Sequence, residues 1–178
     1  DVLAGLGAEV VAAEEWLKGE WSGIAVHGQT DLILELPGKR LLVVDYKRSK
    51  STGRLKQMQK GFDSQASLYR AMLESGGPKN PAKVELAARL KAAAETGIVY
   101  YLLNDQTALS DSAPPGAEGI AGWQALDGDI ASEALGRIRQ HLAEVRAGRV
   151  TLNREGDGKF FEDKAGIKPY ALEASPLT

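Results

Sequence analysis

Two aspartates and a lysine have the residue types and spacing of a metal-dependent hydrolytic centre. Asp45 and Lys47 are two positions apart in an apolar stretch, so on a β-strand both side chains project from one face. Asp31 lies in the preceding apolar segment and can approach Asp45 if the two segments pair antiparallel. Neighbouring carboxylates repel each other unless a cation lies between them, and hard oxygen ligands suit Mg²⁺ or Mn²⁺. Such a cation would activate water and neutralise a phosphate, with Lys47 orienting the water or stabilising developing charge, which predicts phosphodiester hydrolysis.

A glutamine and a tyrosine extend this site. Gln65 and Tyr69 are four residues apart in the clearest helical segment, so they lie on one face of the helix. An amide and a phenol in that position can contact a phosphate or the region of the lysine. The alternative is a helix edge with Tyr69 half in the core, and the spacing from Lys47 is what favours a functional role.

Three β-strands are expected to carry the aspartates and the lysine. The strands are predicted over Glu9–Trp16, Ile24–Leu36 and Arg40–Lys47, with turn signals at Lys18-Gly19 and Pro37-Gly38. The short connection at Pro37-Gly38 suits an antiparallel hairpin. Asp31 and Asp45 would then meet at the end of this hairpin away from its turn.

Helices and one further strand are expected to complete the fold. A helix is predicted to begin near Asp63, with Asp63 or Ser64 as its cap, and to end at Gly76-Gly77-Pro78. The other expected elements are a helix over Val84–Ala94, a buried strand over Ile98–Leu103, an exposed loop over Asp105–Gly122 and a long helix over Ile130–Ala147.

Composition limits the classes of protein that the chain can represent. With 178 residues, 43% of them apolar, the chain is long enough for one core, and a single domain over residues 1–178 is expected. The formal charge of −2 gives no general attraction to a polyanion, but residues 47–60 carry six basic residues and no acidic one. That run is expected to be a solvated loop and the start of a helix, and DNA contact by its basic side chains is modestly favoured. The absence of cysteine excludes disulfides and thiolate catalysis and suits the cytoplasm, and no apolar run suggests a membrane span.

Three ordered blocks resemble the RecB-type branch of the PD-(D/E)xK nuclease superfamily. The blocks are Gly28-Gln29-Thr30-Asp31, Val43-Val44-Asp45-Tyr46-Lys47 and Gln65-Ala66-Ser67-Leu68-Tyr69. They match the G-x-x-D strand, the D-Y-K strand and the Q-x-x-x-Y helix of that branch in order and spacing. The resemblance covers residues 24–73 well and the rest loosely. It implies a restriction-endonuclease-like α/β fold, in which helices flank a central mixed β-sheet.

The resemblance also implies roles for individual residues. By resemblance, the metal ligands are Asp31, Asp45 and the main-chain carbonyl of Tyr46, the catalytic lysine is Lys47, and the DNA-facing residues are Gln65 and Tyr69. The implied activity is that of a Mg²⁺- or Mn²⁺-dependent DNA nuclease, an exonuclease acting in recombination or repair. DNA is the expected partner, and a helicase domain or subunit is a candidate second partner.

Two features depart from the branch. Its members usually carry a metal-binding His or Glu on an upstream helix, but here the upstream residues indicate a strand, on which Glu14 or Glu15 could substitute. His27 lies four residues before Asp31 on the next strand, so it is expected on the same face as an accessory residue. The chain is therefore expected to be a piece of a longer protein. Many AddB-type relatives end in cysteines that hold an iron–sulfur cluster, and without cysteine no such cluster is expected. The alternative function is a catalytically inactive DNA-binding or scaffolding module of a helicase–nuclease complex.

Overall fold

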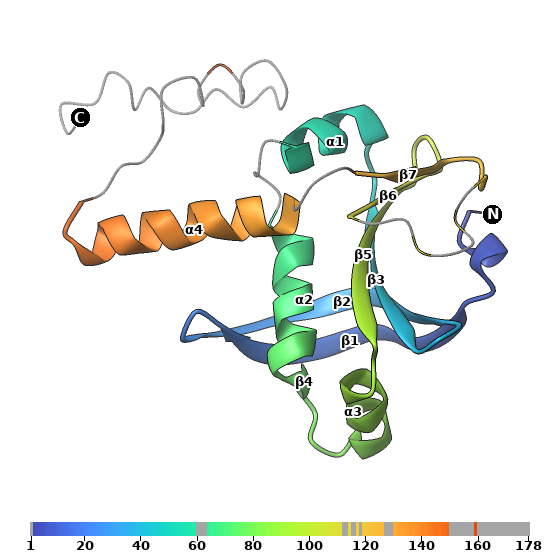
Figure 1. Cartoon of the computed structure of the whole chain (residues 1–178), viewed down its shortest axis with the longest axis horizontal. Helices are drawn as coiled ribbons and strands as arrows, with labels where there is room; N and C mark the ends of the chain where they lie inside the picture. The colour runs from blue at the N-terminus through green and yellow to red at the C-terminus, as the bar shows by residue number, and fades with distance from the viewer. Residues whose placement is uncertain are drawn as a thin grey trace. The chain divides into compact units, whose positions relative to one another are not determined.

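A computed structural model describes residues 2–59, 64–111, 114, 117, 119–126, 130–149 and 159. The chain divides into two compact units, Asp1–Leu135 and Gly136–Thr178. The first unit contains a seven-stranded sheet with the strand order β4-β1-β2-β3-β5-β6-β7 (Figure 1). Within the described residues, every helix is too short or too polar to cross a membrane.

A long antiparallel hairpin forms the first two strands of the sheet. It follows a short 3-10 helix, η1, at Ala4–Leu6, and it comprises β1 over Glu9–Trp21 and β2 over Ile24–Leu36. The connecting Ser22 and Gly23 have φ values of 51° and 76°, the left-handed conformations that a two-residue hairpin turn requires. The hairpin turn therefore lies at Ser22-Gly23.

Gly19 marks a close approach of a helix rather than a turn. The prediction that the first strand would end at Trp16, before a turn at Lys18-Gly19, is wrong because both of these residues pair within the β1–β2 ladder. A Cβ atom at Gly19 would lie 2.7 Å from the Cα atom of Met72 in the helix packed on the strand. A glycine inside β1 thus accommodates the backbone of that helix.

The next strand makes the sheet mixed, as predicted. Strand β3, Arg40–Lys47, pairs antiparallel with β2 from Leu32 to Leu36, which confirms the hairpin predicted around Pro37-Gly38. On its other side β3 pairs in parallel with β5, Glu95–Leu102. Strand β5 confirms the buried strand that the apolar run predicted there.

Helices occupy most of the described connection between β3 and β5. The elements in chain order are α1 over Ser51–Gln59, α2 over Gln65–Ser75, β4 over Gly77–Pro78 and α3 over Val84–Lys91. Helices α2 and α3 confirm the two helices predicted in this region. Ser64 lies at the N-cap position of α2 without a side-chain capping hydrogen bond, and Asp63 lies outside the described residues. Helix α1 takes up much of the basic run that was expected to be a solvated loop and helix start.

Two short strands lie at the far edge of the sheet. Strand β6, Thr107–Ser110, pairs antiparallel with β5, and β7, Trp123–Ala125, pairs in parallel with β6. Leu109 is fully buried, so the exposed loop predicted over Asp105–Gly122 is wrong for β6. The reason is that β6 is stabilised by its pairing with β5, which a four-residue segment between polar residues does not reveal.

Apolar side chains pack on both faces of the central strands. One face carries Leu34, Leu36, Leu42 and Val44, and the other carries Leu17, Ile33, Leu41 and Val43, which pack against Tyr69, Met72 and Leu73 of α2. Helix α2 lies across β1 and β2 (Figure 1). Burying each such apolar side chain stabilises the fold by about 1.5–3 kcal/mol relative to leaving it exposed. This packing holds α2 against the strands that carry the aspartates.

The long helix near the C-terminal end confirms its prediction. Helix α4 spans Ile130–Arg146 and crosses the boundary between the two units. Gly148 follows it with a φ of 75°, the left-handed conformation typical of a glycine that ends a helix.

Candidate active site

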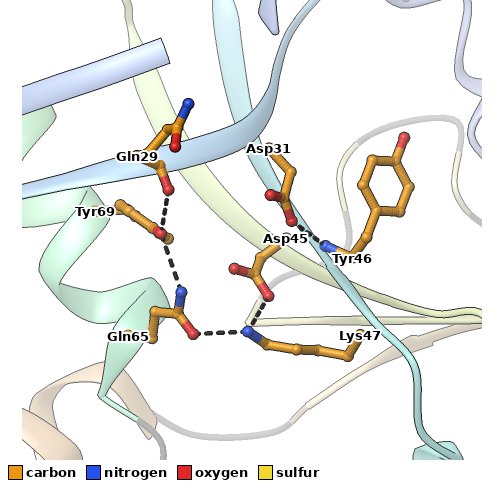
Figure 2. A network of polar contacts seen from close by, with 7 residues as sticks. All are labelled: Gln29, Asp31, Asp45, Tyr46, Lys47, Gln65 and Tyr69. Atoms are coloured by element: carbon orange, nitrogen blue, oxygen red, sulfur yellow. Dashed lines mark hydrogen bonds and ion pairs between the residues drawn. The ribbon is translucent and has the colours of Figure 1, made fainter. Parts of the chain in front are cut away.

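Asp31 and Asp45 occupy opposite positions on two paired strands. The β2–β3 ladder pairs Leu32 with Val44, so the next residue on each strand is an aspartate. Asp45 is buried, with 3% of its surface exposed, and Asp31 is half-buried. Asp31 Oδ2 accepts a hydrogen bond of 2.7 Å from the main-chain N–H of Tyr46 (Figure 2). The structure thus places the two carboxylates at the end of the hairpin away from its turn, where the sequence predicted them.

The neighbours of the buried Asp45 carboxylate shift its pKa in opposite directions. Burial raises the pKa of Asp45 above its ordinary value, contact with Lys47 opposes this, the charge of Asp31 raises the pKa further and Arg54 opposes it. Asp45 Oδ2 lies 2.6 Å from Lys47 Nζ, which makes an ion pair. Among the described residues, no other group donates a hydrogen bond to this oxygen. A buried carboxylate oxygen therefore keeps unused acceptor capacity, which favours a bound cation.

This donor set fits a hard divalent cation. Two adjacent carboxylates, one with a buried oxygen whose one polar contact among the described residues is Lys47, are the oxygen ligands that Mg²⁺ and Mn²⁺ take. Tyr46 points its ring away from the aspartates and against the ring of Tyr101, with the centroids 5.9 Å apart. The role of the Tyr46 carbonyl as a ligand stays a prediction. Among the described residues, no third His, Cys, Asp or Glu joins the pair in a group that could hold a metal.

The residues considered as a third ligand lie in other surroundings. Glu15 is buried and forms an ion pair with Lys83. Glu14 is exposed at an irregular position of β1, where its φ is 49°. His27 is exposed, and its ring centroid lies 6.2 Å from that of Trp16. The structure therefore gives Glu15 an ion-pairing partner and gathers none of the three with both aspartates.

A chain of hydrogen bonds connects Lys47 to helix α2 and then to strand β2. Lys47 Nζ donates to Gln65 Oε1 at 2.7 Å, and Gln65 Nε2 donates to the hydroxyl of Tyr69 at 3.0 Å. The Tyr69 hydroxyl in turn donates to the main-chain carbonyl of Gln29 at 2.5 Å (Figure 2). Gln65 and Tyr69 are thus on one helix face, as predicted, but Tyr69 is 4% exposed and its hydroxyl is engaged inside the protein. Burial raises the pKa of Tyr69, so the phenol stays protonated at neutral pH.

A second positive charge lies close to the carboxylates. The guanidinium carbon of Arg54, on α1, lies 5.0 Å from the centroid of the Tyr100 ring, and Lys47 Nζ lies 5.8 Å from the same centroid. Tyr100 is buried opposite Asp45 in the β3–β5 ladder. The sequence showed Arg54 only as one member of a basic run, and the continuous apolar run of β5 gave no sign that Tyr100 would lie close to two cations.

A comparison with protein families identifies the superfamily. The family model of the PD-(D/E)XK nuclease superfamily matches residues 3–158, which include both aspartates, the lysine and helix α2. No curated protein and no solved structure gives a match. The mixed sheet with its flanking helices is the restriction-endonuclease-like α/β fold of that superfamily. The chain belongs to the PD-(D/E)XK nuclease superfamily.

Proposed function

We propose that the chain is a divalent-metal-dependent deoxyribonuclease that hydrolyses phosphodiester bonds. The observation that carries the proposal is the pair of Asp31 and Asp45, in which a buried oxygen of Asp45 has unused acceptor capacity beside Lys47. Membership of a nuclease superfamily supports the same reaction. Packing alone gives no reason to place two carboxylates and a lysine at one buried strand end.

Each residue of the site has a distinct part in this reaction. Asp31, Asp45 and the main-chain carbonyl of Tyr46 would hold Mg²⁺ or Mn²⁺. When bound, such a cation lowers the pKa of a coordinated water and neutralises charge on the phosphate oxygens. Lys47 Nζ is held between Asp45 and Gln65, so its positive charge is fixed beside the carboxylates before the substrate arrives. Arg54 adds a second positive charge that attracts the phosphate.

DNA is the substrate that the sequence blocks favour. The G-x-x-D, D-Y-K and Q-x-x-x-Y blocks, which end at Asp31, Lys47 and Tyr69, support a place in the RecB/AddB-like branch. From this we infer an exonuclease that acts in DNA recombination or repair. A helicase domain or subunit would deliver the DNA strand to it.

The second candidate function is an inactive module that binds DNA or scaffolds a helicase–nuclease complex. One observation favours it, because within the described residues the two aspartates have no third carboxylate or histidine beside them. An inactive module would bind DNA in a salt-sensitive way without binding Mn²⁺. The proposed nuclease would bind the cation and cut.

Substitutions of the two central residues separate these functions. Asp45→Ala and Lys47→Ala are expected to abolish Mn²⁺-dependent cleavage of end-labelled DNA while the circular dichroism spectrum stays that of the wild type. Lys91→Ala is the matched control, because Lys91 is an exposed lysine at the end of α3, outside the basic run. Cleavage that survives both changes would refute the proposed function. A wild type that binds DNA, does not bind Mn²⁺ and does not cut would establish the inactive module.

A further inference from the structure

Among the described residues, one edge of strand β2 has no partner strand next to the proposed site. Strand β1 pairs along the whole of β2, whereas β3 pairs only with Leu32–Leu36, so in the described part of the chain residues 25–30 have a free edge. The Tyr69 hydroxyl binds the Gln29 carbonyl at this edge. Because alternate residues of a strand direct their main-chain groups to the same edge, the N–H and C=O groups of His27 and Ala25 also point there.

A cavity of about 430 Å³ lies between this edge and helix α2. Its walls include Ala25, Val26, His27 and Gly28 of β2, and Leu68 and Met72 of α2. Gln65 and Tyr69 also line it, so among the described residues no lysine, arginine or carboxylate side chain lines the cavity. It therefore suits a neutral ligand with apolar faces and polar edges.

Gly28 sets how closely the helix approaches this edge. A Cβ atom at Gly28 would lie 3.2 Å from Tyr69 Cε1 and 3.4 Å from Met72 Cε. Any side chain there would push against the tyrosine that anchors Gln65 or would enter the cavity. The glycine thus leaves the main chain of β2 accessible to a ligand.

Gln65 joins the cavity to the proposed catalytic centre. Its side chain lines the cavity, and its Oε1 accepts the hydrogen bond from Lys47 Nζ. A group bound in the cavity is therefore close to whatever phosphate lies beside Lys47. On the face of the sheet opposite α2, the exposed Trp16 packs beside His27, and Lys79 Nζ lies 5.0 Å from the Trp16 ring centroid. Aromatic rings with an adjacent cation suit a single nucleic-acid strand.

We propose that this cavity binds one unpaired nucleobase of the substrate strand, next to the phosphate that is cut. The proposal rests on the proposed nuclease function. The base would place its faces against Leu68 and Val26, and its polar edge against the main-chain groups of Ala25 and His27. An added peptide strand fits less well, because Tyr69 already occupies the Gln29 carbonyl that such a strand would need.

The test compares intact strands with strands that lack one base. Single-stranded oligonucleotides carry an abasic residue at each position in turn, and their Kd by fluorescence anisotropy and their KM and kcat with Mn²⁺ are measured. At one position near the cut, loss of the base should raise Kd and KM about tenfold, or about 1.4 kcal/mol, with kcat nearly unchanged. Leu68→Phe narrows the cavity and should raise both constants similarly for the intact strand.

The abasic strand gives the decisive comparison between variants. Leu68→Phe and the wild type should bind it equally, whereas the control Leu86→Phe, a half-buried leucine on α3, should keep the full difference between intact and abasic strands. Equal sensitivity to base loss in the wild type and in Leu68→Phe, or no sensitive position at all, would overturn the proposal. If the wild type discriminates between strands by anisotropy but hydrolyses none, the base site stands and the nuclease function fails.

Discussion

Removal of the Tyr69 hydroxyl tests whether the hydrogen bonds from Gln29 to Lys47 act as one unit. Tyr69→Phe keeps the buried ring but removes the group that donates to Gln29 and accepts from Gln65. A hydrogen bond contributes about 1 kcal/mol net, so the loss of two should lower the free energy of unfolding by about 2 kcal/mol. For a chain of this length the melting temperature should fall by about 4–8 °C.

The effect on catalysis follows from the bond between Gln65 and Lys47. Hydrogen bonds to charged groups contribute about 1.5–3 kcal/mol. When the whole of this contribution is made in the transition state, Gln65→Ala lowers kcat by about 10- to 150-fold, which is the largest effect expected. Tyr69→Phe removes one anchor of Gln65 and should lower kcat less than Gln65→Ala does, by at most about tenfold, at nearly constant KM. The double variant should be no slower than Gln65→Ala alone, because the hydroxyl acts on Lys47 only through Gln65.

Steady-state cleavage at 25 °C, with the folded fraction checked by circular dichroism, measures these effects. Tyr101→Phe is the control, because Tyr101 is a half-buried tyrosine that packs with the other face of the sheet. The reasoning is refuted if Tyr69→Phe lowers the melting temperature and leaves kcat unchanged, since the hydroxyl would then be structural only. It is also refuted if the two single effects multiply in the double variant.

Three other changes give separate tests. Asp45→Asn should raise the melting temperature of the metal-free protein, because burial raises the pKa of Asp45 and the charged carboxylate destabilises the fold above that pKa. The difference in melting temperature should shrink as the pH falls and Asp45 of the wild type becomes protonated. Mn²⁺ at a hundred times its Kd should stabilise the wild type by about 2.7 kcal/mol and leave Asp45→Asn unchanged. Asp105→Ala removes the acceptor of the Ser51 N–H and hydroxyl at the start of α1 and should cost about 0.5–1 kcal/mol in a urea titration. Burial acts to raise the pKa of Asp105, but the Ser51 hydrogen bonds outweigh it and lower that pKa, so this loss should disappear at acid pH. Arg54→Gln should lower kcat/KM about tenfold for the loss of roughly 1.4 kcal/mol, whereas Lys56→Gln, an exposed residue of α1, should not.

The placement of the aspartates was predictable because a hairpin has few degrees of freedom. Once the turn at Pro37-Gly38 is fixed, antiparallel pairing sets Asp31 opposite Asp45, and the two-residue period puts Lys47 on the face of Asp45. The helical period likewise fixes Gln65 and Tyr69 on one face of α2. Local geometry was sufficient for these residues.

The remaining parts of the site depend on long-range packing. Gln29 contributes a main-chain carbonyl, which every residue possesses, so no residue type could identify it. Arg54 lies over the Tyr100 ring, which comes from β5, so the local sequence does not distinguish it from Lys50 or Lys56. Strand β6 escaped prediction for a related reason, since its partner and its burial are both supplied by distant residues.

A change of phase in strand β2 links the metal site, the hydrogen-bonded chain and the cavity. Val26 and Gly28 pack towards α2, and so does Ile33, although strict alternation would put Ile33 on the opposite face. The alternation of side chains between the two faces of β2 therefore changes phase by one residue between Gly28 and Ile33. This point lies opposite Glu14, the residue of β1 with a φ of 49°. This shift puts Asp31 on the α2 face with Asp45, whereas the His27 side chain is on the opposite face, so the expectation that His27 shares a face with Asp31 is wrong. It also coincides with the point where β3 stops pairing, which frees the edge that Tyr69 and the cavity use. Straightening this irregularity would therefore disturb the carboxylate pair and the base site together.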